Sequence, residues 1–338
     1  MLDIFSSDAF SVMALTDSIN SMPFIPGRAG QVIDWNEQGI TTTVVMIEEQ
    51  NGELRLINPT PRGGVPETVP KPRRKIRNLS VPHYEIMDSI YADEVQGVRA
   101  FGTETQVQTV RGLVDRRMLE HVQMRLDPTL EYQRLGAVKG VILNADGTVL
   151  YNLFDEFGVT QEAVVDMNLA AVAPVMGATR QVAANITRLA ANSLGGMGYS
   201  GLHAFAGDAF FDQLVGSAEV RQTYLNQQEA AQLRTGIPVF GTFNFGGIVW
   251  ENYRGAVGDV QFVETDEAHI FPTGVPGLFR TLYAPADYIE TVNTVGLPRY
   301  SKQWNMPNDK GVYMEVQMNA ISYCTRPRVL IKAVRDAG

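Results

Sequence analysis

The sequence predicts an α+β fold, because helical and β-type segments are mixed along the chain and do not alternate strictly as in a wound parallel sheet. A long apolar stripe at helical spacing follows Thr103, which predicts one dominant helix. β-rich runs flanked by turn residues lie at 40–57, 141–153, 237–253 and 315–334. No repeat of about 20–50 residues is visible, which argues against a solenoid.

The composition is that of a globular chain of 338 residues, long enough for roughly two domains. Apolar residues make up 45% and charged residues 19%, far from the signature of disorder. The net charge of −9 argues against a general nucleic-acid binder, which requires clustered Lys and Arg. The single cysteine, Cys324, excludes intramolecular disulfides and fits a reducing compartment. Residues 1–10 lack a secretory pattern and no run of about 18 apolar residues occurs, so we expect no membrane association.

Residues 1–37 predict an N-terminal arm. Residues 7–19 have helical character, and the prolines and glycines that follow make the remainder irregular. An arm of this length has little core of its own, so it must lie on its own body or on a neighbouring molecule.

An extended hairpin is predicted next, over residues 38–82. Asn51-Gly52 separates the β-rich runs 40–49 and 53–57, and this dipeptide favours a tight hairpin turn. Five prolines between 58 and 72 exclude a regular helix or a central strand there. A lone two-stranded excursion is marginal in water, so we expect it to rest on another chain.

The basic run Lys71-Pro-Arg-Arg-Lys-Ile-Arg77 is the one charge cluster that points to a partner. Five positive charges in seven residues suit pairing with acids of a neighbouring subunit. Contact with nucleic acid and a simply solvated loop stay open as alternatives. As candidate interface residues we select the charged and polar side chains of this excursion, namely Glu48, Glu49, Asn51, Arg55, Arg73, Arg74 and Arg77.

The dominant helix begins near Thr103, where Thr-Glu-Thr-Gln106 matches a capping box. Asp127-Pro128 is expected to stop it and start a second helix, with Asp as the cap and Pro at the first helical position. Residues 141–153 predict a hairpin that turns at Asp146-Gly147.

The C-terminal half predicts a helical region followed by strands. Residues 159–229 are expected to be mostly helical and are Ala-rich between 169 and 194. Residues 237–253 have β character around Gly246-Gly247, and 315–334 predict a strand pair around Arg326-Pro327.

Motifs that could carry catalysis are weak. Gly196-Met-Gly-Tyr-Ser-Gly201 matches the dinucleotide fingerprint, but the segment before it is predicted as a helix instead of the required strand. Four dispersed histidines lack metal-ligand spacing, and Cys324 is expected to be a buried inert thiol. The adjacent acids Asp155-Glu156 and Glu48-Glu49 would point to opposite faces of a strand. We therefore predict no catalytic residue, cofactor or metal.

Several segments resemble the lambda-type major capsid proteins, the phage major capsid protein E family. The resemblance is most specific in the C-terminal third and loose in residues 1–100. The segments that carry it are 155–158, 236–240, 268–279, 283–293, 296–300, 315–322 and 326–330.

This resemblance implies the HK97-type capsid fold, with an N-terminal arm, an extended hairpin loop, a peripheral domain with a long spine helix, and an axial domain. It implies the arm at 1–37, the extended loop at 38–82 lying over an adjacent subunit, the peripheral domain at 83–158, the axial domain at 159–265 and a return to the peripheral domain at 266–338. It implies no catalytic residues, and we can assign no Lys–Asn pair of the kind that welds subunits in some relatives of this fold.

The implied function is the major capsid protein of a tailed bacteriophage, which assembles with itself as hexamers and pentamers into an icosahedral shell. Scaffold, portal and decoration proteins would be its partners, and the shell would enclose double-stranded DNA without reading its sequence. Its place would be the virion, and the host cytoplasm during assembly. The alternatives are an encapsulin-like nanocompartment shell and a nucleotide-dependent enzyme that uses Gly196–Gly201.

Overall fold

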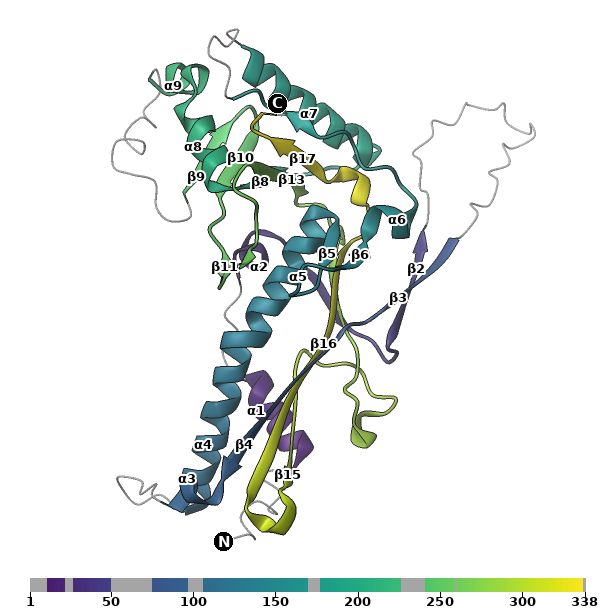
Figure 1. Ribbon diagram of the computed structural model, residues 1–338. Coiled ribbons are helices and arrows are strands. Elements are labelled where there is room, and N and C mark those ends of the chain that lie inside the picture. Colours follow the sequence, from purple (N-terminus) through teal and green to yellow (C-terminus); the bar gives the residue numbers. More distant parts are fainter. Residues whose placement is uncertain are drawn as a thin grey trace, which may run out of the picture. The chain divides into compact units, whose positions relative to one another are not determined.

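The computed structural model describes residues 11–21, 27–49, 75–96, 106–169, 177–225, 241–258 and 260–336. The chain divides into two compact units (Figure 1). Unit 1 is drawn from 1–45, 79–134 and 280–322, and unit 2 from 46–78, 135–279 and 323–338.

Unit 1 is built on a five-stranded sheet in the order β1-β14-β16-β15, with β4 also paired to β16. β15 and β4 are both antiparallel to β16, whereas β1 runs parallel to β14. The strands are β1 (Asn36–Gly39), β4 (His83–Tyr91), β14 (Phe279–Tyr283), β15 (Tyr300–Asn305) and β16 (Gly311–Cys324). The helices are α1 (Val12–Ser21), α2 (Arg28–Val32), α3 (Ala92–Gln96), α4 (Gln106–His121) and α5 (Asp127–Lys139), which continues into unit 2, with 3₁₀ turns at Ile289–Thr291 and Pro307–Asp309.

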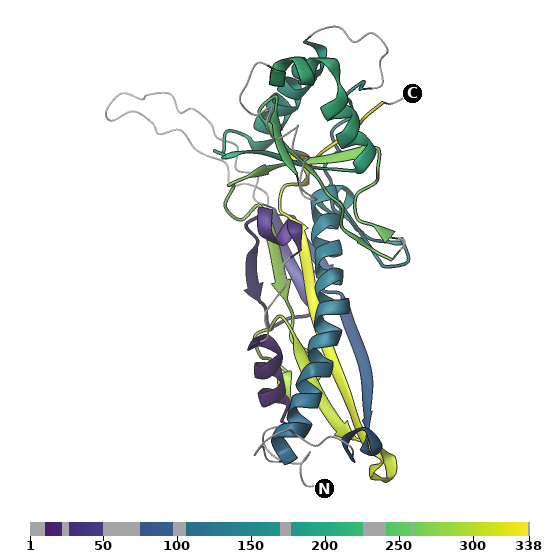
Figure 2. The same cartoon turned by 90° about the vertical axis from the view of Figure 1, so that its left-hand side faces the viewer.

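The core of unit 1 lies between one face of the sheet and the long helix, which Figure 2 shows running along the sheet. Every second residue of β16 points to the helix, as the period of two in a strand requires. These are Val312, Met314, Val316, Met318 and Ala320, which pack with Val114, Met118 and Val122.

The long helix is continuous where the sequence predicts a break. Residues Val122–Leu126 form a π-helical turn, and the N–H of Asp127 donates to the carbonyl of Val122. Asp127 itself has α-helical dihedral angles, so the prediction that Asp127-Pro128 stops the helix is wrong. The wider turn changes the hydrogen-bond register just before Pro128, where a proline ring would otherwise meet the carbonyl four residues earlier. The proposed cap at Thr103 lies outside the described residues.

Part of the N-terminal arm is held on α5 by buried polar contacts. The carboxylate of Glu131 accepts a hydrogen bond from the backbone N–H of Ala29 at 2.6 Å. Arg134, which is 2% exposed, donates to Glu37 at 2.5 Å and lies 5.2 Å above the ring of Trp35. The arm residues therefore complete the core of unit 1.

Unit 2 contains a six-stranded sheet in the order β7-β17-β13-β8-β10-β9. The strands are β7 (Val165–Asp166), β8 (Gly201–Ala206), β9 (Thr242–Phe245), β10 (Ile248–Asn252), β13 (Glu267–Thr273) and β17 (Ile331–Val334). The helices are α6 (Leu153–Phe157), α7 (Ala178–Leu194), α8 (Asp208–Gly216) and α9 (Ala218–Leu225), with a 3₁₀ turn at Pro327–Val329. Its core joins the buried stripe of α7 to Phe210, Leu214 and Trp250.

Three small two-stranded sheets complete the description. They are β2 (Val44–Glu49) with β3 (Lys75–Ser80), β5 (Val141–Leu143) with β6 (Val149–Asn152), and β11 (Ala256–Val257) with β12 (Val260–Gln261). The predicted hairpin at Asp146-Gly147 is confirmed, with Gly147 at φ 83°. β2 pairs with β3, and the predicted Asn51-Gly52 turn and its return run 53–57 lie outside the described residues.

Three predictions for residues 155–334 are corrected. β8 interrupts the region predicted as mostly helical, because its small apolar residues are buried in the middle of a sheet. β16 and β17 do not pair with each other, since β17 joins β13 and β7 in the other sheet. Asp155 and Glu156 lie on helix α6 and not on a strand.

The structure confirms that a helix precedes Gly196–Gly201 and that Cys324 is buried. Helix α7 ends at Gly195, which is in the left-handed region with φ 62°, so Gly196–Gly201 follow a helix and not a strand. Cys324 is fully buried, and burial raises the pKa of its thiol to about 12. Each histidine has a polar partner: Asn319 and Glu85 for His83, Asp88 for His121, Glu251 for His203 and Glu267 for His269.

Trp250 and Trp304 allow the contributions of a buried and an exposed tryptophan to stability to be compared. Trp250 is fully buried, stacks on Phe210 at 5.6 Å and donates to the carbonyl of Phe245, whereas Trp304 is 37% exposed. Trp250→Ala is expected to lower the free energy of unfolding of unit 2 by about 3–5 kcal/mol. Trp304→Ala should cost less than about 1 kcal/mol. Urea unfolding of the unassembled subunit, followed by circular dichroism, measures both, and equal losses would contradict this packing.

We expect ionised Glu267 to stabilise unit 2 at neutral pH and to lose this effect in acid. The neighbouring side chain of His269, and the ammonium of Lys332 at 2.5 Å, hold the pKa of Glu267 at about 2, although partial burial acts in the opposite direction. A carboxyl group with a lowered folded-state pKa stabilises the fold above its ordinary value and loses that effect as the pH falls.

Glu267→Gln should therefore be less stable than the parent at pH 7, and the difference should shrink as the pH falls from 4.5 to about 2. Urea midpoints across this pH range measure it. Asp212→Asn, at an exposed carboxylate of the same unit, is the control and should change stability by less than about 0.5 kcal/mol. A difference that does not vary with pH would refute the assigned ionisation.

Candidate subunit interface

The residues selected from the sequence are only partly brought together by the structure. Glu48 and Glu49 are on β2 and Arg77 is on the paired strand β3. Asn51, Arg55, Arg73 and Arg74 lie outside the described residues. The seven residues remain a prediction about an interface.

Arg77 is the selected residue with described contacts, and they are within its own chain. Its guanidinium donates to the backbone carbonyl of Asp155 at 3.4 Å. Its Nη2 atom is so close to Gly158 that a Cβ there would stand 2.9 Å away, and Gly158 has φ 57°. These contacts fix the base of the β2–β3 ribbon, so they support a structural role for Arg77 at that point.

A second surface, which sequence reasoning missed, is the face of the unit 1 sheet that points away from α4. We call it the outer face. Alternation along the three antiparallel strands places on it His83, Glu85, Met87, Ser89 and Tyr91 of β4, Tyr300, Lys302 and Trp304 of β15, and Tyr313, Glu315, Gln317 and Asn319 of β16. The packing of Val312, Met314 and Val316 on the opposite side supports this assignment.

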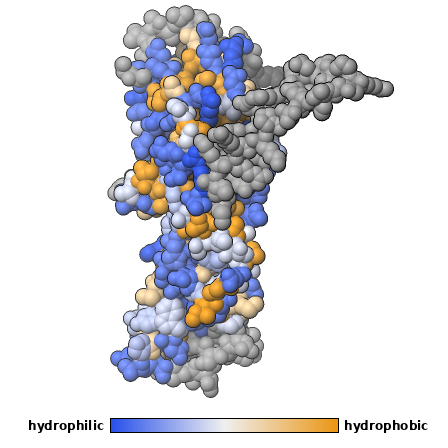
Figure 3. Space-filling view, turned by 90° about the vertical axis from the view of Figure 1, so that its right-hand side faces the viewer, coloured by the Kyte–Doolittle hydropathy of each residue, from blue (hydrophilic) through white to orange (hydrophobic). Residues whose placement is uncertain are grey.

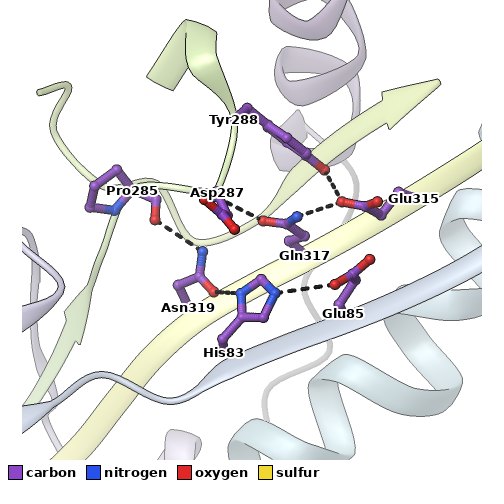
Figure 4. Close-up of polar contacts among 8 residues, drawn as sticks. All are labelled: His83, Glu85, Pro285, Asp287, Tyr288, Glu315, Gln317 and Asn319. Carbon is purple, nitrogen blue, oxygen red and sulfur yellow. Dashed lines mark hydrogen bonds and ion pairs between the residues drawn. The ribbon is translucent and has the colours of Figure 1, made fainter. Parts of the chain in front are cut away.

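A row of buried polar side chains on β16 forms the inner part of the outer face (Figure 4). Glu315, Gln317 and Asn319 are 8%, 2% and 4% exposed, so each needs hydrogen-bond partners. The Tyr288 hydroxyl donates to Glu315 at 2.9 Å, and Gln317 also donates to that carboxylate.

The remaining partners of this row come from the loop that contains Tyr288 and from strand β4. The backbone N–H of Asp287 donates to Gln317 at 3.2 Å, and Asn319 donates to the carbonyl of Pro285 at 3.1 Å. The ring of His83 meets Asn319 at 2.7 Å. The row therefore fastens residues 284–297, which we call the knob loop, to β16.

The charges of three carboxylates act on the Tyr288 hydroxyl. Burial raises the pKa of this hydroxyl above the usual value, and the charges of Glu315, Glu85 and Glu290 raise it further. Lys302 lies 5.0 Å above the Tyr288 ring and pairs with Glu290 at 3.0 Å. With Asp287 exposed beside them, carboxylates outnumber the ammonium group, so the rim of the knob loop is negative.

The knob loop buries some of its polar groups and exposes large apolar side chains beside its carboxylates. The hydroxyl of Thr291, which is 8% exposed, donates to the carbonyls of Ala286 and Tyr288. The outward residues are Ile289, Val292, Val295 and Leu297, with exposures of 91%, 65%, 60% and 40%. An ordered loop with this inverted polarity is expected at a contact surface.

The part of the outer face beyond the knob loop is open and partly aromatic. Met87, Tyr91 and Trp304 are 61%, 49% and 37% exposed, and the rings of Trp304 and Tyr313 lie 5.8 Å apart. Figure 3, which views the molecule from the side opposite to Figure 2, shows hydrophobic residues lying among polar ones there. Aromatic residues and methionine are enriched at protein interfaces, so this surface is suited to binding another protein segment.

The described residues form surfaces suited to binding. Within the described ranges, no group of three or more His, Cys, Asp and Glu side chains could hold a metal ion. In the same part of the chain no helix is long and apolar enough to cross a membrane. The polar row and the knob loop are therefore the best-defined features from which a function can be argued.

Comparison with known proteins identifies the family. Residues 11–335 match the model described as phage major capsid protein E. The chain belongs to the phage major capsid protein E family.

Two relatives match nearly the whole chain. The major capsid protein of Salmonella phage Felix O1 is 24% identical over 368 aligned residues, covering 100% of this chain and 99% of that protein. The major capsid protein of Pseudomonas phage KPP10 is 25% identical over 344 residues, covering 96% of each chain. In the mature capsid of bacteriophage PhiM1, a chain aligns with a TM-score of 0.49 and 12% identity, covering 93% of this chain and 88% of that one.

The sequence-based assignment to a phage major capsid protein is confirmed. The mixture of helices and strands confirms the predicted α+β class. Proteins of this family form the virion capsid, which gives this chain its function and its location. Both curated relatives are phage proteins, so the phage shell has more support than an encapsulin-like compartment. Gly196–Gly201 do not form a dinucleotide-binding fingerprint, because helix α7 precedes the glycines where the fingerprint requires a strand.

Removing the Tyr288 hydroxyl tests the polar row. Tyr288→Phe should destabilise unit 1 by about 1–2 kcal/mol, because the buried Glu315 carboxylate loses a donor. Tyr91→Phe, at a 49% exposed ring on the same face, is the matched control and should change stability by less than about 0.5 kcal/mol. Equal effects in urea unfolding of the unassembled subunit would rule out this role for the hydroxyl.

Proposed function

We propose that this capsid protein assembles as hexamers and pentamers into the icosahedral head shell that encloses the double-stranded DNA of a tailed phage, and that it catalyses no reaction. The observation that carries the proposal is the match to the capsid family over residues 11–335, together with relatives of nearly equal length. The net charge of −9 suits a protein that encloses DNA without binding it tightly.

We propose the segment roles that the resemblance to the HK97-type capsid fold implies. Residues 1–37 are the N-terminal arm, 38–82 the extended loop, 83–158 the peripheral domain with its spine helix, 159–265 the axial domain and 266–338 the return to the peripheral domain. The spine helix corresponds to α4 and its continuation into α5. The axial domain surrounds the five-fold and six-fold centres of the shell.

The extended loop binds a neighbouring subunit. Its acidic and polar residues Glu48, Glu49 and Asn51 and its basic residues Arg55, Arg73, Arg74 and Arg77 make this contact in the proposal. Because the segment carries both positive and negative charges, it should bind its partner in one defined register. The charges contribute more to this specificity than to the strength of binding. The pairing of β2 with β3 supports the proposal, because it holds the two ends of the segment together.

Scaffold, portal and decoration proteins are further proposed partners. Each subunit contact in such a shell is modest, and closure multiplies it, so the contacts need not be covalent. We propose a non-covalent shell, in keeping with the lack of an assignable Lys–Asn pair in the sequence. Subunits are made in the host cytoplasm before they enter the shell.

Self-assembly is the direct test. The purified protein, alone and with the head-assembly proteins of its phage, is studied by size-exclusion chromatography with light scattering and by negative-stain electron microscopy. Closed shells, tubes or free hexamers are expected because the shell is built from repeated copies. A monomer or dimer that stays inert at all concentrations with those proteins present would refute the proposal.

A further inference from the structure

We propose that strand β17 of unit 2 is released from its neighbour β13 in mild acid, through protonation of His269. Both strands belong to the six-stranded sheet (Figure 1). The inference goes beyond the proposed shell function, because it concerns a pH-dependent change within a single subunit.

His269 and Lys332 face each other across the antiparallel pair of β13 and β17. They are register partners, so their side chains leave the same face of the sheet. Glu267 lies two residues before His269 on β13 and therefore shares this face. Its carboxylate pairs with the ammonium of Lys332 at 2.5 Å and lies 3.5 Å from the His269 ring. One carboxylate thus serves both the imidazole and the ammonium group.

The other face of the same two strands holds β17 in the core of unit 2. Ala268 and Ile270 of β13 pack there together with Ile331 and Ala333 of β17. β17 has four residues, so these two side chains supply its apolar anchoring in that core. A strand anchored by so little apolar area responds to a single added charge.

The charges around His269 favour its neutral form. Burial lowers the pKa of His269 below its ordinary value, and the ammonium groups of Lys139 and Lys332 lower it further, whereas Glu267 acts in the opposite direction. Glu264 also faces this cluster, where its charge acts on Lys139. Protonation would place a second cation directly opposite Lys332, and like charges at such a cross-strand pair are destabilising.

Other charged groups near the pair have partners of their own. His203 on β8 lies on the same face, diagonal to His269, and the carboxylate of Glu251 is 3.0 Å from its ring. Asp266 pairs with Arg335 at 2.8 Å. Neither of these carboxylates is therefore available to compensate a positive charge on His269.

Acid consequently favours the open strand. The ordinary pKa of a histidine is about 6.5, and that of His269 is lower while the sheet is closed. As the pH falls, the open form binds the proton first, so the pairing is fully stable above the ordinary value and weakens below it. One linked proton changes the opening equilibrium by up to about tenfold for each pH unit. Glu267 stays ionised over this range, because its pKa is about 2.

Hydrogen exchange of the unassembled subunit measures the opening. Mass spectrometry follows peptides that cover residues 327–336, and the rates are corrected for the intrinsic pH dependence of exchange. The opening equilibrium of β17 should rise about fivefold or more for each unit between about pH 6 and pH 5. Peptides that cover β8 are the internal reference and should change less than about twofold.

Three variants assign the effect. His269→Gln removes the titrating group and should hold the rise below about twofold. Lys332→Gln, at a side chain that is 29% exposed, removes the opposing cation and leaves Glu267 to compensate protonated His269, so the rise should fall by at least about half. His83→Gln, at a side chain of unit 1 that is 43% exposed, is the matched control and should keep the full rise. Circular dichroism at neutral pH checks the fold of each.

Nuclear magnetic resonance of histidine ring carbons in the parent gives an independent readout. The His269 signal is assigned by its loss in His269→Gln or, should that variant not fold, by its shift in Lys332→Gln. It should show no protonation step at about pH 6.5 while β17 remains protected from exchange.

Three results would each overturn the inference: an absent rise in the parent, a full rise retained in His269→Gln, or a His269 ring that titrates at about pH 6.5 with β17 still closed. Assembly at neutral pH tests the shell function separately, so either proposal can fail while the other stands.

Discussion

The arrangement of unit 1 depends on the burial of β16 on both faces. A strand in that position carries side chains to two sides, and only one side can be filled by apolar packing on α4. The other side bears Glu315, Gln317 and Asn319, whose polar groups cannot be buried without hydrogen bonds. The knob loop supplies these bonds from Tyr288, Asp287 and Pro285. The path of the loop therefore follows from the need to satisfy one row of buried polar groups.

The inverted polarity of the knob loop is a consequence of the same row. Because Tyr288 and backbone groups of the loop turn inward to meet β16, large apolar side chains are left outside beside the exposed Asp287 and Glu290, where they raise the free energy of an isolated subunit. Burying apolar surface recovers about 25 cal/mol for each Å², so a contact with another subunit converts this cost into association. A shell protein can use such a surface because it is not meant to remain a monomer.

Sequence alone predicted those features of the fold that depend on local chemistry. The turn at Asp146-Gly147 and the end of α7 at Gly195 require a positive φ, which few residues adopt. Predictions failed where tertiary structure decides. Pro128 is tolerated because a π-helical turn precedes it, and the short apolar strand β8 cannot be told from a helix by its periodicity.

The candidate interface was harder to predict from sequence than the fold. Charge and proline content single out the segment 38–82, because those properties belong to the residues themselves. The outer face is different, since it depends on β4 and β15 pairing on either side of β16. No local pattern places Glu85 beside Tyr288, which lie about 200 residues apart in the chain. The spacing of Ile289, Val292, Val295 and Leu297 in the sequence does not by itself distinguish an exposed loop from a core segment.

Weak contacts of this kind have an advantage in a closed shell. The chain contains one cysteine, which is buried, so disulfides between subunits do not hold the assembly. A few apolar side chains and partly solvated ion pairs give a modest free energy at each contact, and a misplaced subunit can therefore leave again. Closure then multiplies the many correct contacts, and the whole shell becomes stable although no single contact is. The carboxylate rim adds specificity to this scheme, because a charge pattern rejects a wrong register more strongly than it strengthens the right one.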